Sequence, residues 1–247
     1  MIDRKRTWLE LAIVFALSLG ASAVYSLVSL LAKLTAPGGL ARSSSSINPS
    51  LASREWLDAT YQLLSIFFGL APVALVLFLL YRANENPFEK IGLSFKNFKF
   101  WSSRGLALAA VIGVPGILLY LGARALGLSS QVIAADLGEY WWTIPVLLMA
   151  AAKAGLLEEV LVVAYLFERL EALGFSIRAQ LLISALLRAS YHLYQGFAGF
   201  FGNLVMGLVF GWAYKRFGKI MPLVFAHFLL DAFAFVGYAL FAGILPL

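Results

Sequence analysis

The chain has 247 residues, of which 62% are hydrophobic and 13% are charged, and its mean hydropathy is +0.86. Soluble domains are about 45 to 50% apolar, so this composition excludes an ordinary soluble protein and indicates a polytopic membrane protein. The chain has no cysteine, which excludes disulfides, thiol catalysis and cysteine-based zinc sites. The net charge of +6 comes from 19 Lys and Arg scattered between apolar runs, a pattern that fits membrane topology rather than nucleic-acid binding.

Seven apolar runs are long enough to be interpreted as helices. They lie at residues 8–33, 56–81, 105–128, 141–167, 179–195, 198–214 and 220–245. The fourth run is long, and a break near Gly155 would create a re-entrant piece and change the helix count. The sequence therefore predicts an all-α transmembrane helix bundle of seven to eight spans, forming a single integral membrane domain over residues 1–247.

Two connections and the N-terminus complete the predicted organisation. The serines of residues 43–46 are typical of a linker, and residues 84–101 of a loop with an interfacial amphipathic piece. Basic residues 4–6 before the first run imitate a secretory signal. Because apolar residues continue to Leu31, longer than a cleavable signal needs, we expect a retained helix.

Basic residues are distributed unevenly between the predicted connections. With a cytoplasmic N-terminus, 13 Lys and Arg fall in inside segments and 4 in outside segments, while Lys153 and Arg188 lie within the membrane. Positive charge concentrates on the cytoplasmic side of membrane proteins. The distribution predicts a multi-pass protein of the cell membrane with its N-terminus in the cytoplasm.

Several ionisable residues interrupt the apolar runs, among them the chain's two histidines. Each such group costs about 2.5 to 3.5 kcal/mol at a bilayer centre, so a cluster of them indicates a functional site. One at a time, these residues could equally be interhelical hydrogen-bonding groups or buried ion pairs. The candidate residues are Glu158, Glu159, Arg188, His192, His227 and Asp231.

Helical geometry predicts that these groups meet. Counted from the predicted cytoplasmic helix ends, Glu158, Arg188 and Asp231 lie about 16, 15 and 18 Å deep. On the same count, His192 lies about 21 Å deep and His227 about 12 Å. Arg188 and His192 are four residues apart, as are His227 and Asp231, so each pair shares a helix face. We therefore expect one shared cavity in the cytoplasmic half.

The two adjacent glutamates are expected to differ in role. Neighbouring residues point about 100° apart on a helix, so Glu158 and Glu159 cannot face one target equally. This predicts one reacting carboxylate and one structural carboxylate held by a cation.

These residues resemble the CAAX protease and bacteriocin-processing family of intramembrane endopeptidases, also called the Abi family. Its pattern is a double glutamate with an arginine four residues after the second, then Phe-x-x-x-His, then His-x-x-x-Asn or Asp, on three helices. The resemblance covers residues 141–240, which it marks as the catalytic core. The matching residues, in chain order, are Glu158, Glu159, His192, His227 and Asp231.

Two positions depart from the family pattern. Val163 replaces the arginine of the first motif, followed by Ala164 where a glycine is usual, and Arg188 replaces the phenylalanine of the second. Our hypothesis is that these changes compensate, because a guanidinium lost from one helix is returned from its neighbour and keeps Glu159 paired. A separation of Arg188 from both glutamates beyond salt-bridge distance would contradict it.

The resemblance implies an intramembrane endopeptidase that cuts a membrane-associated protein or peptide, including a lipidated one. It assigns Glu158 as general base, His192 as its partner, and His227 with Asp231 to the oxyanion side. An ionised aspartate accepts hydrogen bonds but cannot donate them, so we expect Asp231 to orient His227. The expected partners are the substrate and the lipid bilayer, with no nucleic acid and no cofactor.

Three alternatives remain open at this point. Two histidines and a carboxylate are enough to bind a catalytic zinc ion, although no His-Glu-x-x-His is present. The departures at Val163 and Arg188 are compatible with a catalytically silent membrane scaffold or regulator of the same fold. Glu and His within membranes also form the relays of proton-coupled transporters, but no inverted repeat is detectable here.

Other polar and small residues are interpreted as structural. Gly199, Asn203, Gly207 and Gly211 recur every four residues and predict a close-packing helix face, with Asn203 bonding across helices. Two further groups have two interpretations each. Tyr191, Tyr194 and Gln195 contact either substrate or the membrane interface, and Lys153 is either a site residue or a side chain reaching toward the membrane surface.

Overall fold

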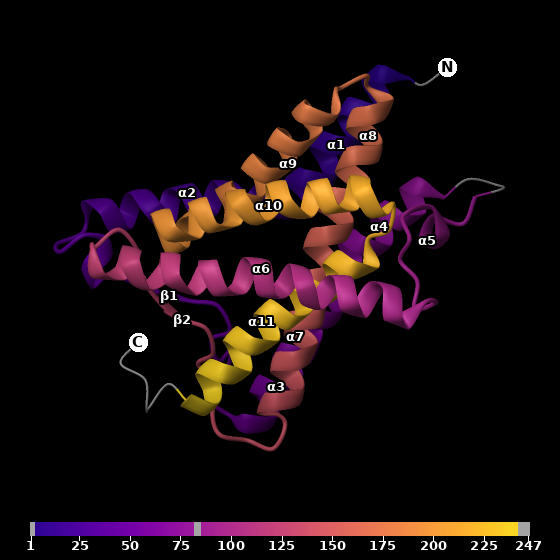
Figure 1. Ribbon diagram of the computed structural model, residues 1–247. Coiled ribbons are helices and arrows are strands. Elements are labelled where there is room, and N and C mark those ends of the chain that lie inside the picture. Colours follow the sequence, from indigo (N-terminus) through magenta and orange to yellow (C-terminus); the bar gives the residue numbers. More distant parts are fainter. Residues whose placement is uncertain (1–2, 82–84, 242–247) are drawn as a thin grey trace.

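The computed structural model describes residues 3–81 and 85–241. It is 76% helical and nearly all-α, as predicted (Figure 1). The α-helices are α1 (Arg4–Ala16), α2 (Leu19–Thr35), α3 (Glu55–Gly69), α4 (Ala71–Leu80), α5 (Pro87–Lys90), α6 (Phe98–Ala125), α7 (Thr143–Glu158), α8 (Leu166–Ala172), α9 (Ile177–Tyr191), α10 (Phe197–Phe217) and α11 (Met221–Phe241). Two short 3₁₀ turns, η1 (Leu40–Arg42) and η3 (Leu193–Gln195), and a π-helix, η2 (Glu159–Tyr165), complete the helical elements.

The number of helices able to cross a membrane is smaller than predicted. Four in the described part of the chain are long and apolar enough, or five if α1 and α2 form one bent span. The predicted count of seven to eight is therefore not confirmed. Helix α9 shows one reason, because its 15 residues are fewer than the roughly 20 that a span needs.

The first apolar run forms two helices rather than one. Helix α1 ends at Ala16 and α2 begins at Leu19, with axes bent by 52°. The Ser18 hydroxyl donates to the Val14 carbonyl at 2.6 Å, satisfying a carbonyl that the interrupted helix leaves free.

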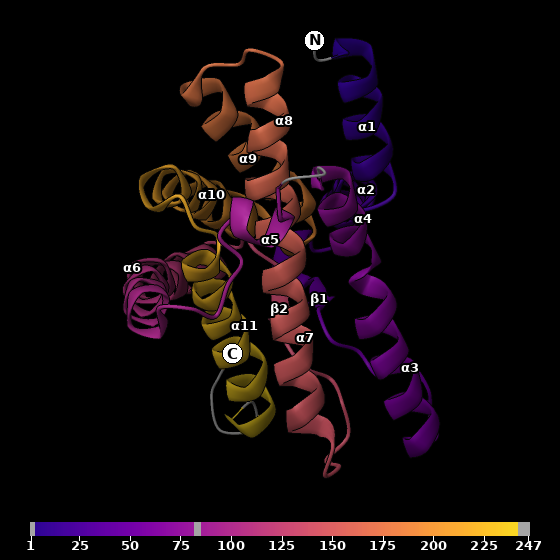
Figure 2. The same ribbon diagram turned by 90° about the vertical axis from the view of Figure 1, so that its right-hand side faces the viewer.

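The helices follow two main directions. Figure 1 shows α6 and α10 running across the view and α7 and α11 running downward from their centre, and Figure 2 shows α6 and α10 end-on. Helix α6 packs against both α10 and α11, while α9 packs along α10. Segments distant in the sequence therefore meet around the middle of the molecule.

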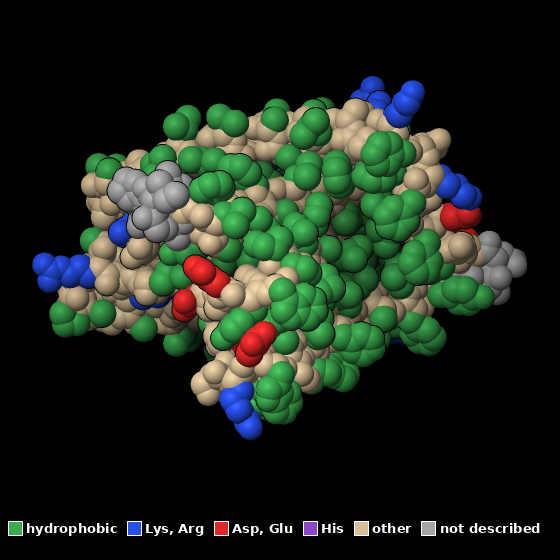
Figure 3. Space-filling model, turned by 90° about the horizontal axis from the view of Figure 1, so that it is seen from below, with side chains coloured by type: hydrophobic (Ala, Val, Ile, Leu, Met, Phe, Trp, Pro, Cys, Tyr) green, Lys and Arg blue, Asp and Glu red, His purple; other side chains and the backbone are tan. Residues whose placement is uncertain are grey.

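Apolar side chains cover much of the surface. Phe78, Phe95 and Trp141 are 74%, 80% and 86% exposed, and one face is largely apolar in Figure 3. Water-soluble monomers rarely expose contiguous apolar surfaces of this extent. The surface agrees with the apolar helices in identifying a membrane protein.

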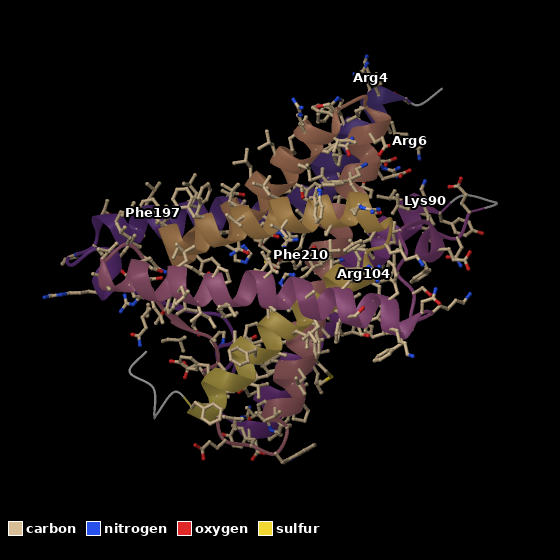
Figure 4. All side chains as sticks on the ribbon, viewed as in Figure 1. Arg4, Arg6, Lys90, Arg104, Phe197 and Phe210 are labelled. Carbon is tan, nitrogen blue, oxygen red and sulfur yellow. The ribbon has the colours of Figure 1, made fainter. Side chains whose placement is uncertain are left out.

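The most completely buried segment is η2, in the middle of the helix from Thr143 to Ala172. All seven of its residues are buried, and Val160 to Val163 are 0% exposed. Helix α10 contributes Phe210, also 0% exposed, which Figure 4 shows near the centre of the molecule. The core therefore surrounds the π-helix.

A small parallel sheet replaces the predicted serine linker. Strand β1 (Ser44–Ser46) pairs with β2 (Gln131–Ile133), with Ser45 opposite Val132. Ser45 is 5% exposed, and its buried hydroxyl is satisfied by a hydrogen bond inside the structure. The prediction of a linker at residues 43–46 was therefore wrong, and this segment joins the α2–α3 and α6–α7 connections.

The connection before α6 agrees in part with its prediction. Residue 84 lies outside the described residues, and α5 covers only Pro87–Lys90. Helix α6 begins at Phe98, earlier than the predicted start at residue 105. The first turn of α6 is therefore formed by residues that were predicted to end the loop.

Candidate active site

Three helical segments bring the predicted ionisable residues together. Glu158 ends α7 and Glu159 begins η2, Arg188 lies in the last turn of α9, and His227 lies on α11. Helix α11 packs along α7, and α9 contacts η2. Convergence from three helices is what the sequence predicted.

Arg188 makes the contact that the compensation hypothesis required. Its Nη2 lies 2.7 Å from Glu159 Oε1, and its Nη1 lies 3.3 Å from Glu158 Oε2. The side chains of Arg188 and Glu159 are both 0% exposed. The guanidinium also lies 5.8 Å from the centre of the Phe210 ring. One cation therefore contacts both glutamates, although unequally.

His227 lies between two carboxylates. Its Nδ1 is 2.6 Å from Glu159 Oε1, and its Nε2 is 3.5 Å from Asp231 Oδ2. Carboxylates only accept hydrogen bonds, so each imidazole nitrogen is oriented to donate. Glu159 Oε1 thus accepts hydrogen bonds from both Arg188 and His227, and Glu159 is the structural centre of the cluster.

Glu158 has a different environment from its neighbour. The Tyr191 hydroxyl donates to Glu158 Oε2 at 2.7 Å, and the Glu158 side chain is 12% exposed, compared with 0% for Glu159. The bond to Tyr191 was not predicted. The available signal was its position three residues after Arg188, which places both side chains on neighbouring parts of one helix face.

His192 stands at the C-terminal end of α9. Its Nδ1 lies 3.0 Å from the Arg188 carbonyl oxygen in its own helix. A carbonyl only accepts, so Nδ1 carries the proton and, in the neutral ring, Nε2 keeps a free lone pair. In the described part of the chain, no hydrogen bond or ion pair joins this imidazole to Glu158 or His227, and its Nε2 is the nitrogen able to accept a proton.

The cluster is closely packed and reaches the surface at one edge. Asp231 is 24% exposed at its side chain and Glu158 is 12%, whereas His227 is 6%. A separate cavity lined by Gly92, Phe100 and Lys219 contains none of the candidate residues. Among these three residues, Asp231 and Glu158 are therefore the more exposed.

The π-helix begins at the second glutamate. The sequence placed a possible break near Gly155, but α7 continues through Gly155 and the irregularity starts at Glu159. Wider π turns within α-helices are frequent at functional sites. Val163 and Ala164, the positions that depart from the family pattern, lie buried inside this segment.

Gly155 allows α7 and α11 to approach closely beside His227. A methyl group at Gly155 would lie 2.9 Å from the Val224 carbonyl oxygen and 3.5 Å from His227 Cβ. Gly207 plays the same part between α10 and α9, since a methyl group there would lie 2.7 Å from Ala185 Cα and 3.5 Å from Arg188 Cδ. The predicted close packing of α10 is therefore observed at Gly207.

Replacing Gly155 with Ala is expected to lower the free energy of unfolding by about 1 to 3 kcal/mol, because the backbone of α11 must move. The displacement reaches His227, so turnover should fall as well. Thermal unfolding in detergent micelles would measure the loss. Gly237→Ala on α11 is the matched control, since nothing lies within 4 Å of its added carbon and it should not destabilise the fold. Equal stability of the two variants would contradict the close approach.

Other polar residues lie where the sequence left them undecided or placed them differently. The Asn203 amide donates to the Gly199 carbonyl of its own helix at 3.0 Å, so the predicted bond across helices was wrong. The Lys153 side chain passes beside Gly69, which places it between α7 and α3. Tyr194 and Gln195 lie in η3 and bond to each other at 3.0 Å.

Comparison with known proteins supports the resemblance seen in the motifs. A protein-family model described as "Type II CAAX prenyl endopeptidase Rce1-like" covers all five candidate catalytic residues and Arg188. Residues 140–233 match this Rce1-like family. A search of curated proteins and a search of solved structures found no match to the chain.

The Rce1-like segment holds the three helical segments of the cluster, whereas α1 to α6 lie outside it. The match agrees with the family resemblance seen in the motifs, and the matched family is described as a prenyl endopeptidase. Within residues 3–81 and 85–241, no three His, Asp or Glu side chains are grouped so as to hold a metal ion. Metal analysis of the purified protein remains the test of the zinc alternative.

Proposed function

We propose that the protein is a multi-pass endopeptidase of the cell membrane that hydrolyses a peptide bond of a membrane-associated substrate, including a lipidated one. The observation that carries this proposal is the division of roles between the two glutamates. Glu159 is fully buried and bound by Arg188 and His227, while Glu158 reaches the exposed edge of the cluster. In this proposal residues 141–240 form the catalytic core of a single membrane domain with a cytoplasmic N-terminus.

Glu158 and His192 would activate the attacking water. Glu158 accepts a proton as the water oxygen bonds to the scissile carbonyl carbon, and His192 Nε2 holds the same water with its free lone pair. The proton then passes to the departing amine as the carbon–nitrogen bond breaks. The products are one carboxylate and one protonated amine, so both protons of the water end on the amine nitrogen, and the reaction consumes one water.

His227 would stabilise the negative charge that develops on the carbonyl oxygen. Its Nδ1 is held tightly by Glu159 at 2.6 Å, while its Nε2 is 3.5 Å from Asp231 and is the less engaged donor. A fixed donor aimed at a developing oxyanion stabilises the transition state strongly in a water-poor site. We assign Nε2 to the oxyanion and Asp231 to the orientation of the ring, with the single Nε2 proton shared between the oxyanion and the longer contact to Asp231.

Replacing Asp231 with Asn is expected to lower turnover about tenfold, since a neutral amide holds the His227 imidazole less firmly than a carboxylate does. Initial rates of peptide cleavage would measure the effect. Undiminished proteolysis would argue that residue 231 acts as a hydrogen-bond donor. Asp136→Asn, a change on the exposed connection after β2, is the matched control and should leave turnover unchanged.

Direct cleavage separates this proposal from its main alternative. The purified protein would be incubated with a farnesylated peptide ending in a CAAX sequence and with a cell-membrane peptidome, beside a Glu158→Ala variant. Cleavage that depends on Glu158 supports the protease. Binding of membrane proteins without cleavage, unchanged in the variant, supports a silent scaffold, which the occupation of Glu158 Oε2 by both Tyr191 and Arg188 would then explain.

A further inference from the structure

A hydrogen-bond network surrounds the turn that follows His192. The Tyr194 carbonyl in η3 accepts from Lys33 Nζ of α2 at 2.6 Å and from Ser45 Oγ of β1 at 2.8 Å. The Tyr194 backbone N–H donates to Ser26 Oγ, also of α2, at 2.6 Å. Two elements from the N-terminal part of the chain therefore bind both backbone polar groups of one residue of the turn.

The next carbonyl is bound from a third element. The Gln195 carbonyl accepts from Ser129 Oγ at 2.9 Å and from the Ser130 backbone N–H at 3.2 Å, and Ser130 Oγ lies 3.1 Å from the same oxygen. Ser130 Oγ also lies 2.7 Å from Ser45 Oγ, which joins the two halves of the network. Both serines before β2 are 0% exposed.

Lys33 supplies a positive charge where only neutral oxygens bind it. Within the described residues it has no carboxylate partner, and it contacts the Ser45 hydroxyl and the Tyr194 carbonyl. Its ammonium lies at the carbonyl end of α9 and η3, where helices carry partial negative charge. A cation at this place strengthens the hold on the turn beyond what a neutral donor gives.

Ser45 and Lys33 do not form a nucleophile and base in this arrangement. Ser45 is 5% exposed, and its hydroxyl donates to the Tyr194 carbonyl while Lys33 and Ser130 contact the same oxygen. A hydroxyl has one proton to donate. The geometry therefore gives Ser45 a structural bond.

The turn held by this network is the one that sets the backbone of His192. The Gln195 backbone N–H donates to the His192 carbonyl at 3.1 Å, and the His192 N–H donates to Ala189 at 3.2 Å. Movement of Tyr194 or Gln195 is therefore transmitted to the residue that carries the imidazole. None of Ser26, Lys33, Ser45, Ser129 or Ser130 lies in the Rce1-like segment 140–233.

We infer that Lys33, acting with Ser45 and Ser130, is a positioning residue that fixes the turn after His192 and, through it, the position of the His192 imidazole. This inference rests on the proposed function, because it assigns Lys33 a part in the same reaction without contact with substrate. It makes the small β1–β2 sheet a support of the catalytic centre. A displacement of about 1 Å in a catalytic group lowers rates up to about a hundredfold.

The two histidines make a direct test practical. Protein labelled with ¹⁵N only in histidine gives signals from two imidazoles, which the His227→Gln variant assigns. We expect Lys33→Met to shift the His192 signals and leave those of His227 in place, and to lower kcat about ten- to a hundredfold with KM changed less than about twofold. Lys33→Arg should restore both, and Arg42→Met, on an exposed residue nearby, should change neither.

The outcomes distinguish this inference from the proposed function. Unchanged His192 signals in Lys33→Met, or equal shifts of both histidines, would overturn the positioning role. If the native protein cleaves nothing, the proposed function fails, while the histidine spectra still decide whether Lys33 positions the ring. If Lys33→Met does not fold, Ser45→Ala removes one donor to Tyr194 with less loss of packing, and the same two readouts apply.

Discussion

Replacing Glu158 with Gln is expected to lower peptide cleavage by about a hundred- to ten-thousandfold, the range that a positioned general base contributes. The amide cannot accept the proton of the attacking water, but its oxygen still accepts the Tyr191 hydroxyl, so the fold should persist. Rates with a farnesylated CAAX peptide, or with the membrane peptide found to be cut, would measure the change. Helical content and thermal unfolding would confirm that the variant is folded.

The matched control is another paired glutamate on the same long helix. Glu168 of α8 lies 2.5 Å from Lys90 of α5 and is separated from Glu158 by the whole π-helix. Glu168→Gln should therefore leave cleavage unchanged. A Glu158→Gln variant that cleaves at the native rate would remove Glu158 from the mechanism and leave the scaffold as the better account.

Replacing Arg188 with Met is expected to cost about 3 to 5 kcal/mol of folding free energy, because it leaves Glu159 with a buried charge that has lost its main partner. Both side chains are 0% exposed, so water cannot replace the lost contact. Unfolding in mixed micelles would measure the loss. Arg188→Lys should recover part of it, since the ammonium keeps the charge but cannot bind both glutamates as the planar guanidinium does.

A second substitution separates charge from packing in this result. Adding Glu159→Gln to Arg188→Met removes the uncompensated charge and should restore stability. Adding Val163→Arg instead returns the cation to the helix where the family pattern carries it, and partial recovery would support the compensation hypothesis. A single Arg188→Met variant as stable as the native protein would contradict the structural importance of the ion pair.

The convergence of the cluster could be predicted because ionisable residues stand out against apolar surroundings. Arg188 and His192, and likewise His227 and Asp231, share helix faces by spacing alone. The contact of Arg188 with Glu159 followed from the need to pair a buried carboxylate, whereas its second contact, with Glu158, was not predicted. Tyr191 was missed because an aromatic residue near other aromatics indicates packing or an interface as readily as a hydrogen bond.

The irregular parts of the fold were harder to predict from the sequence. Every residue of η2 is buried, so this segment shows no alternation of polar and apolar residues around the helix. Without that alternation, the sequence pattern cannot reveal a change from α-helix to π-helix. No proline marks the break after Ala16, so the sequence gives no direct sign of it. The serines of β1 are not among the residues that strands favour. Pairing between residues 44–46 and 131–133 is a long-range contact that local patterns cannot specify.

The π-helix η2 lies between α7 and α8 in the continuous helix from Thr143 to Ala172. Upstream of Glu159, the facing of α7 is set by its contact with α11, while downstream α8 is set by contacts with α1 and α9. An uninterrupted α-helix would tie these two orientations together at 100° per residue. The wider turns change the helical phase between the two ends, so α7 and α8 each face their own neighbours within one continuous helix.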